Sequence, residues 1–218
     1  MTDFAAARAN MVECQVRPNK VTDSRLLAAM ASVPRERFVP EALAGHAYVD
    51  DDIAVAPGRY LMEPMVLARL LQAAAIEPGD VVLDIGCATG YSTAILARLA
   101  ATVVALESDE ALAETAIELL TGLDADNSAV VGGEHAAGYA AQAPYDVIVL
   151  EGAVEQVSEA LGEQLVEGGR LVAVVTGGGR VGKATLMRRV RGALSGRILF
   201  DAAIPPLPGF AVERGFVF

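Results

Sequence analysis

Two carboxylates beside a glycine-rich turn are the residues of this chain best suited to bind a charged ligand. Asp84 lies in an apolar run that begins at Val81, and the turn Gly86-Cys87-Ala88-Thr89-Gly90 follows. A buried strand that leads into a helix through such a turn forms the nucleotide-binding corner of a doubly wound α/β sheet. Glycines there let the backbone approach a ligand closely. Glu107 ends the next apolar run, about where such folds place the acceptor for ribose hydroxyls.

The spacing of this turn indicates which nucleotide is bound. A dinucleotide fingerprint reads G-x-G-x-x-G, whereas this chain has Gly86-x-Ala88-x-Gly90 with Asp84 two residues before it. A carboxylate at Asp84 would repel a pyrophosphate but would suit an ammonium group. We therefore predict S-adenosylmethionine, with Asp84 near its amino-acid end and Glu107 at its ribose. The alternative is an ordinary α/β turn with surface acids.

The loop after the third expected strand adds two candidates. Gly132-Gly133-Glu134-His135 opens on the same edge of the sheet as Gly86 and Glu107, where an adenine would lie. The Glu134 carboxylate can accept the adenine amino proton, and His135 either lines the pocket or packs beside it. The predicted cofactor-binding residues are Asp84, Gly86, Cys87, Ala88, Thr89, Gly90, Glu107, Ser108, Glu134 and His135.

Other motifs are weaker. The stretch Gly177–Lys183 imitates a phosphate loop, but Ala184 replaces the hydroxyl residue that would bind magnesium, so a flexible connection is the better interpretation. His46 has no partner at metal-ligand spacing, and no metal site is expected. No Ser-His-Asp or Cys-His set is present. A methyl transfer to a carboxylate needs alignment rather than a general base, so no catalytic residue is assigned.

Composition limits the possible partners and location. The 218 residues carry a net charge of −11 and are 53% hydrophobic, which favours a single folded domain and disfavours binding to nucleic acid. Lys183 and three nearby arginines are expected to form a solvated face. No apolar run is long enough to span a membrane, and no secretory signal is visible. With only two cysteines, a cytoplasmic protein is the simplest expectation. The oligomeric state stays open.

Strand and helix patterns alternate from residue 79 onward and predict a mostly parallel sheet with right-handed crossovers. The expected core is 79–218 and the N-terminal helical addition is 1–78. Residues 183–191 are expected as a strand, with a helix as the alternative. Strands are expected at 81–85, 102–107, 128–132, 145–150, 170–175, 184–190 and 197–204, the last two joined by 192–196, and helices at 2–16, 24–32, 41–46, 64–75, 91–100, 109–121 and 156–166.

Several of these segments together resemble the protein-L-isoaspartate O-methyltransferase family over nearly the whole chain. The most specific is Val33-Pro34-Arg35-Glu36-Arg37-Phe38-Val39-Pro40, and the glycine corner and Pro144-Tyr145-Asp146 also fit. Further matches are Met11-Val12, Ala47-Tyr48-Val49-Asp50, 164–172 and Pro206-Leu207. The resemblance implies a Rossmann-like class I methyltransferase fold with a seven-stranded sheet, a C-terminal antiparallel hairpin and an N-terminal helical addition. It also implies methyl transfer from S-adenosylmethionine, which becomes S-adenosylhomocysteine, to isoaspartyl residues of a protein or peptide substrate, in protein repair.

The segment that the resemblance assigns to the methyl acceptor differs from the family pattern. Family members carry a motif like LPIGxGxTISxP, whose threonine and serine hydroxyls fall on Tyr60 and Met62 here. A thioether cannot donate a hydrogen bond to a carboxylate. The predicted substrate-binding residues are Arg59, Tyr60, Leu61 and Met62, with Arg59 as a replacement charge. Two alternatives stay open, namely a methyltransferase of the same ancestry with another acceptor and a noncatalytic S-adenosylmethionine-binding protein.

Overall fold

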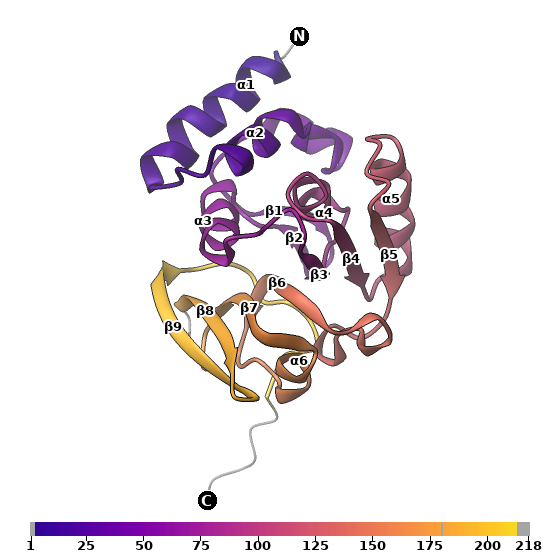
Figure 1. Ribbon diagram of the computed structural model, residues 1–218. Helices are drawn as coiled ribbons and strands as arrows, with labels where there is room; N and C mark the ends of the chain where they lie inside the picture. Colours follow the sequence, from indigo (N-terminus) through magenta and orange to yellow (C-terminus); the bar gives the residue numbers. More distant parts are fainter. Residues whose placement is uncertain (1–2, 180, 213–218) are drawn as a thin grey trace, which may run out of the picture.

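A seven-stranded sheet runs through the centre of the computed structural model, which describes residues 3–179 and 181–212. The strand order is β5-β4-β3-β6-β7-β8-β9, parallel from β5 to β7 and antiparallel for β8 and β9 (Figure 1). This confirms the expected Rossmann-like class I methyltransferase fold. The strands are β3 (Val81–Ile85), β4 (Thr102–Glu107), β5 (Ser128–Gly132), β6 (Tyr145–Val154), β7 (Leu165–Val175), β8 (Gly182–Val190) and β9 (Ala193–Ala202).

The central strands are buried on both faces, which explains their continuous apolar sequences. In β3, Val82 packs into the larger of two hydrophobic clusters, whereas Leu83 and Ile85 pack into the other. The larger cluster includes residues of α3 (Pro64–Ala74), α4 (Tyr91–Leu96) and α5 (Glu110–Thr121). On the other side lie α6 (Glu159–Glu163), Leu207 and Phe210. Helices on both faces therefore fix the carboxyl ends of β3, β4 and β6.

The N-terminal addition consists of short helices and a small hairpin. Helix α1 (Phe4–Met11) continues through a π-helical stretch, Val12–Val16, and a 3-10 turn, Arg17–Asn19. Thr2, where we expected this helix to begin, lies outside the described residues. Helix α2 (Ser24–Ser32) has the predicted bounds and is capped by the Asp23 carboxylate. Two more 3-10 turns, Arg35–Arg37 and Glu41–His46, lead to the hairpin β1 (Ile53–Ala56) and β2 (Arg59–Leu61).

Helix α4 is shorter than the predicted 91–100 because the chain continues in tight turns after Leu96. The Asn127 side-chain amide donates to the carbonyls of Ala97 and Ala100 at 2.9 and 3.1 Å. These carbonyls therefore have a partner without a further helical turn. None of the helices in the described part of the chain is long and apolar enough to cross a membrane.

The C-terminal third corrects three predictions. Helix α6 covers only Glu159–Glu163, because β7 already begins at Leu165, which pairs with Tyr145. Residues 183–191 belong mostly to a strand, so the helical alternative was wrong. The predicted 192–196 connection was also wrong, since β8 and β9 are joined by Arg191 and Gly192 alone. Both have positive φ, 52° and 79°, as a two-residue hairpin turn requires. Within the phosphate-loop-like stretch, Arg180 lies outside the described residues.

Candidate cofactor and acceptor site

The glycine corner turns tightly from β3 into α4 at the carboxyl edge of the sheet. Gly86, Ala88 and Gly90 all have positive φ, at 80°, 51° and 93°. The Gly86 N–H donates to the carbonyl of Leu106 in β4 at 2.8 Å, which keeps the turn close to the neighbouring strand. A side chain at Gly90 would lie 3.3 Å from Ala116 of α5, so glycine also allows close helix packing here.

Glu107 is the charged centre of this edge, and its side chain is fully buried. The N–H groups of Ala88 and Ser108 each donate to it at 2.8 Å, and that of Asp109 donates at 3.0 Å. Burial acts to raise the pKa of this carboxyl, but the neighbouring His135 ring, the Arg59 charge and the backbone donors outweigh it and lower the pKa to about 2. Glu107 is therefore an ionised carboxylate that requires a positive or hydrogen-bonding partner.

That partner is Arg59 of the β2 strand. Its two terminal nitrogens donate to the two Glu107 oxygens at 2.9 and 2.8 Å, a bidentate pair. The second nitrogen also donates to the Gly86 carbonyl at 2.9 Å. Arg59 is only 5% exposed. We predicted Arg59 for the acceptor side, but the structure places its guanidinium against Glu107 and Gly86, which we predicted for the cofactor.

His135 lies against the same pair, whereas its neighbour Glu134 is exposed. The His135 Nε2 atom is 3.3 Å from Arg59 and 3.2 Å from the Ser108 nitrogen. Its Nδ1 atom is 3.1 Å from the carbonyl of Pro208. Because a carbonyl oxygen only accepts, Nδ1 carries a hydrogen. His135 therefore connects the Glu107 edge of the sheet to the C-terminal segment.

Two more buried carboxylates face this region. Asp84 accepts the hydroxyls of Ser92 and Thr93 through one oxygen, at 2.8 and 2.6 Å, while its other oxygen has no partner among the described residues. Burial raises the pKa of Asp84 to about 6. Glu151 also has one unpartnered oxygen, and burial together with the Asp84 charge raises its pKa well above the ordinary value. Unpartnered buried carboxylate oxygens fit a cationic ligand.

Our sequence analysis missed Glu151, although a signal for it was present. Ile85 of β3 pairs with Leu106 on one side and with Leu150 on the other. Glu107 and Glu151 therefore lie at the same level, one residue beyond these pairs. An acid directly after the apolar run 145–150 could have been recognised by the rule that identified Glu107.

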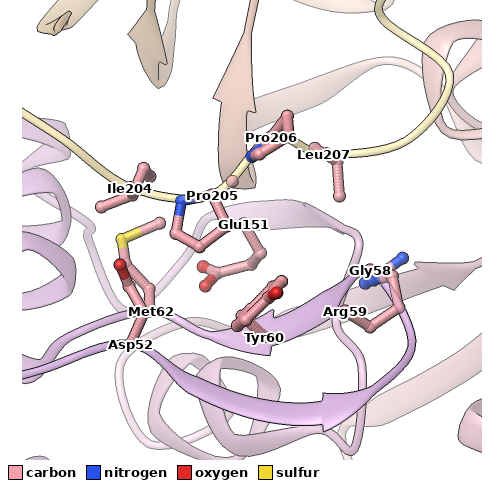
Figure 2. Close-up of a pocket in the computed structure, with 11 residues that line it drawn as sticks. Asp52, Gly58, Arg59, Tyr60, Met62, Glu151, Ile204, Pro205, Pro206 and Leu207 are labelled. Carbon is pink, nitrogen blue, oxygen red and sulfur yellow. The ribbon is translucent and has the colours of Figure 1, made fainter. Parts of the chain in front are cut away.

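The segment 204–207 covers the site from the other side. It is tied to β6 because the Ala153 N–H donates to the Pro205 carbonyl and the Leu207 N–H donates to the Ala153 carbonyl, both at 2.8 Å. Figure 2 shows this segment passing opposite the β1–β2 hairpin, with the Glu151 side chain between them. The cavity left there measures about 10 Å³, room for at most one water molecule.

The predicted acceptor segment is held in place by Arg35, a fully buried residue that our sequence analysis did not assign to the site. Arg35 donates to the carbonyls of Ala47 and Met62 at 2.8 and 2.9 Å. Its guanidinium carbon lies 4.6 Å from the centre of the Tyr91 ring, a cation–π contact. The Met62 side chain is buried and lines the small cavity, as does Tyr60 (Figure 2). The segment therefore presents a thioether where the family pattern has a hydroxyl.

The site fits S-adenosylmethionine in charge but not in space. Asp84 and Glu151 offer free carboxylate oxygens to a cation. In contrast, both Glu107 oxygens are already bonded to Arg59, and Leu207 lies so close to Gly86 that a Cβ atom there would be 2.5 Å from it. A ribose can reach Glu107 only if these two side chains move.

Known proteins resemble this chain in sequence and in fold. The model of the protein-L-isoaspartate(D-aspartate) O-methyltransferase family matches residues 7–201. A protein-L-isoaspartate O-methyltransferase of Koribacter versatilis is 39% identical over 209 residues, 96% of this chain and 94% of the relative. One of Methylorubrum extorquens is 41% identical over 189 residues, 87% of this chain and 81% of the relative.

Solved structures support the fold. A protein-L-isoaspartate O-methyltransferase superposes with a TM-score of 0.80 at 24% identity, covering 93% of this chain and 67% of its own. A structure from Plasmodium falciparum, described as a protein of the same kind in complex with S-adenosyl-L-homocysteine, gives 0.79 at 18% identity and covers 96% of this chain and all of its own. At these identities the superpositions establish the architecture, while the sequence matches establish ancestry. The chain belongs to the protein-L-isoaspartate(D-aspartate) O-methyltransferase family.

Proposed function

We propose that this protein transfers a methyl group from S-adenosylmethionine to the carboxylate of isoaspartyl residues in proteins or peptides, the first step of their repair. The observation that carries the proposal is the family match over residues 7–201, together with relatives about 40% identical over most of the chain. The buried carboxylates at the strand ends support it, because the donor is a cationic nucleoside.

The residues of this chain have distinct roles in the proposal. S-adenosylmethionine supplies the methyl group when bound. Glu107 is the acceptor for its ribose hydroxyls, and the free oxygens of Asp84 and Glu151 are available to its positive charges. The acceptor carboxylate is already a nucleophile, so the protein has to align donor and acceptor and exclude water.

The acceptor is the part of the proposal that the site supports least. Met62 cannot donate a hydrogen bond, and a buried carboxylate without its donor loses roughly 1–3 kcal/mol. This observation favours a second candidate, a methyltransferase of the same ancestry that acts on a different acceptor. A noncatalytic S-adenosylmethionine-binding protein is the third candidate, and it predicts binding without turnover.

A methyl-transfer assay distinguishes these candidates. The purified chain is incubated with radiolabelled S-adenosylmethionine and an isoaspartyl peptide, with the matching aspartyl peptide as the control. Label on the isoaspartyl peptide alone supports the first candidate. Equal or no label on both peptides contradicts it. In that case the double variant Tyr60→Thr, Met62→Ser tests whether the two missing hydroxyls are the cause, and no gain of label would exclude this explanation.

We also propose that residues 1–78 and 79–218 work as one domain in the cytoplasm. The supporting contacts join the two parts of the chain. Arg170 of β7 donates to the carbonyls of Ala74 and Ala75 at 2.9 and 3.0 Å, and the Thr89 hydroxyl donates to the Phe38 carbonyl at 2.6 Å. The acceptor segment lies within the N-terminal part and the donor residues lie in the core.

A further inference from the structure

The Arg59 guanidinium occupies the position where the fold would place a ligand. In doubly wound sheets the acid at the end of the second strand binds the ribose hydroxyls, and this acid is Glu107. Arg59 bonds to both Glu107 oxygens and to the carbonyl of Gly86, the backbone that the glycine turn exposes for close approach. One side chain of the protein thus satisfies the hydrogen-bonding groups that a nucleoside would otherwise use.

The charges around Arg59 favour this arrangement. Asp84, Glu107 and Glu151 are three buried carboxyls at neighbouring strand ends, and Arg59 is the cation bonded to one of them. A planar guanidinium matches a carboxylate in a bidentate geometry that a lysine cannot form. Because the pair is almost fully buried, it is screened little by salt.

Leu207 fills the space beside Arg59. Its side chain lies above Gly86, at 2.5 Å from the position that a Cβ atom would take there, and its backbone nitrogen lies 3.1 Å from the corresponding position at Gly152. Leu207 and Gly152 are in contact because the 204–207 segment pairs with Ala153 of β6. In Figure 2 the Leu207 side chain points down toward the Arg59 region. An apolar side chain and a cation together thus fill the crevice.

We propose that Arg59 and Leu207 are internal occupants of the donor crevice and that S-adenosylmethionine binds by exchange with them. The identity of the ligand rests on the proposed function, whereas the occupation of the crevice rests on the contacts above. Gly58, at the turn of the β1–β2 hairpin, has φ +71°, and a glycine gives this turn a wider choice of backbone conformations than another residue would.

The exchange also couples the two halves of the site. Arg59, Tyr60 and Leu61 form the single short strand β2, and Met62 follows directly. A movement of the hairpin backbone that withdraws Arg59 from Glu107 also moves Tyr60, whose side chain lines the cavity on the acceptor side, while the Met62 carbonyl stays bonded to Arg35. Donor binding would rearrange the acceptor segment, so that the acceptor pocket of the loaded protein differs from the 10 Å³ cavity seen here.

Calorimetry with S-adenosylhomocysteine tests the exchange on the full chain. Wild type is compared with Arg59→Gln, Leu207→Ala and, as a matched control, Arg17→Gln, whose side chain is exposed. Removing an occupant raises the fraction of binding-competent protein, so we expect about tenfold tighter binding for each site variant and no change for the control. Leu207→Ala leaves the buried ion pair intact, so it answers the question even if Arg59→Gln folds poorly.

Unchanged or weaker binding in both site variants would overturn the proposal, because Arg59 and Leu207 would then be part of the ligand's own binding site. Absence of binding in all proteins would overturn it as well. The two proposals fail separately. Tighter binding without methylation of an isoaspartyl peptide contradicts the proposed function only, and methylation without any gain in affinity contradicts the exchange only.

Discussion

Two buried arginines contact the acceptor segment or belong to it, and they are held in different ways. Arg35 is fully buried and donates to two backbone carbonyls, with the Tyr91 ring beside it. Arg59 is 5% exposed and donates to both oxygens of one carboxylate. Arg35 thus links two backbone segments of the N-terminal part to each other. Arg59 instead bonds to a carboxylate at a strand end, a group that a bound nucleoside can also use.

These different partners give Arg35 a structural role and make Arg59 the arginine that a ligand can replace. Burial lowers the pKa of the Arg35 guanidinium, and no carboxylate bonds to it within the described residues. Its bonds to Ala47 and Met62 tie the acceptor segment to the N-terminal turns, whatever the ligand. In contrast, Glu107 retains three backbone N–H donors when Arg59 leaves. We therefore expect Arg35 to stabilise every state of the protein and Arg59 to stabilise the closed state.

The largest effect is expected from removing the Arg35 donors. Arg35→Met keeps much of the volume but leaves the Ala47 and Met62 carbonyls without partners, at roughly 1–3 kcal/mol each, and loses the cation–π contact. We expect the free energy of unfolding in urea to fall by about 3–5 kcal/mol. The matched variant Arg59→Met should lose only about 1–3 kcal/mol, since Glu107 keeps its backbone donors.

Saturating S-adenosylhomocysteine extends this comparison. The ligand should restore much of the stability of Arg59→Met, because it replaces the partner that Glu107 lost. The ligand should not reduce the difference in free energy of unfolding between wild type and Arg35→Met. Equal restoration in both variants would show that the two arginines have the same role.

A second prediction concerns the contact between Gly86 and Leu207. Gly86→Ala places a Cβ at positive φ and 2.5 Å from Leu207, so we expect a loss of about 2–4 kcal/mol from backbone strain and overlap together. In Leu207→Ala the overlap is gone and only the strain remains. A double-mutant cycle should therefore give a favourable coupling on the order of 1 kcal/mol. Zero coupling would mean that Leu207 does not lie over the glycine corner in solution.

The sequence predicted those parts of the fold that depend on local patterns. The bounds of α2, β3, β4 and β5 were predicted to the residue, because capping residues and apolar runs of strand length mark their ends. The early start of β7 was missed, because it depends on pairing of Leu165 with Tyr145, twenty residues earlier in the chain. Such pairing leaves no local pattern.

In the site, too, the features that follow from local patterns were predicted and those that depend on distant contacts were not. The carboxylates at strand ends follow from topology, and Glu107 lies at the edge of the sheet where we expected it. The pairing of Arg59 with Glu107 joins residues 48 positions apart through a small hairpin. The approach of Leu207 to Gly86 joins still more distant segments. No spacing rule predicts which long side chain enters a crevice, because this depends on how the two covering segments pack.

The smallest effect is a pH dependence that distinguishes the two arginines. The pKa of Glu107 is about 2 in the folded chain against an ordinary 4.5, so its stabilising contribution is complete above pH 4.5 and is lost as the pH falls toward 2. In Arg59→Met the pKa of Glu107 is higher, because the Arg59 charge is gone. This variant therefore loses less of its free energy of unfolding as the pH falls over the same range. The stability difference between wild type and Arg59→Met should therefore narrow by about 1 kcal/mol between pH 5 and pH 3.

The difference between wild type and Arg35→Met should stay constant over the same range. The acids whose charges act on Arg35 include Asp52 and Glu151, and burial raises the pKa of Asp52 to about 6 and that of Glu151 well above its ordinary value. Both are mainly protonated by pH 5, so further acid changes little around Arg35. Urea unfolding of the three proteins at pH 5, 4 and 3 measures both differences. Parallel narrowing in the two variants would contradict the assignment of Glu107 to Arg59 alone.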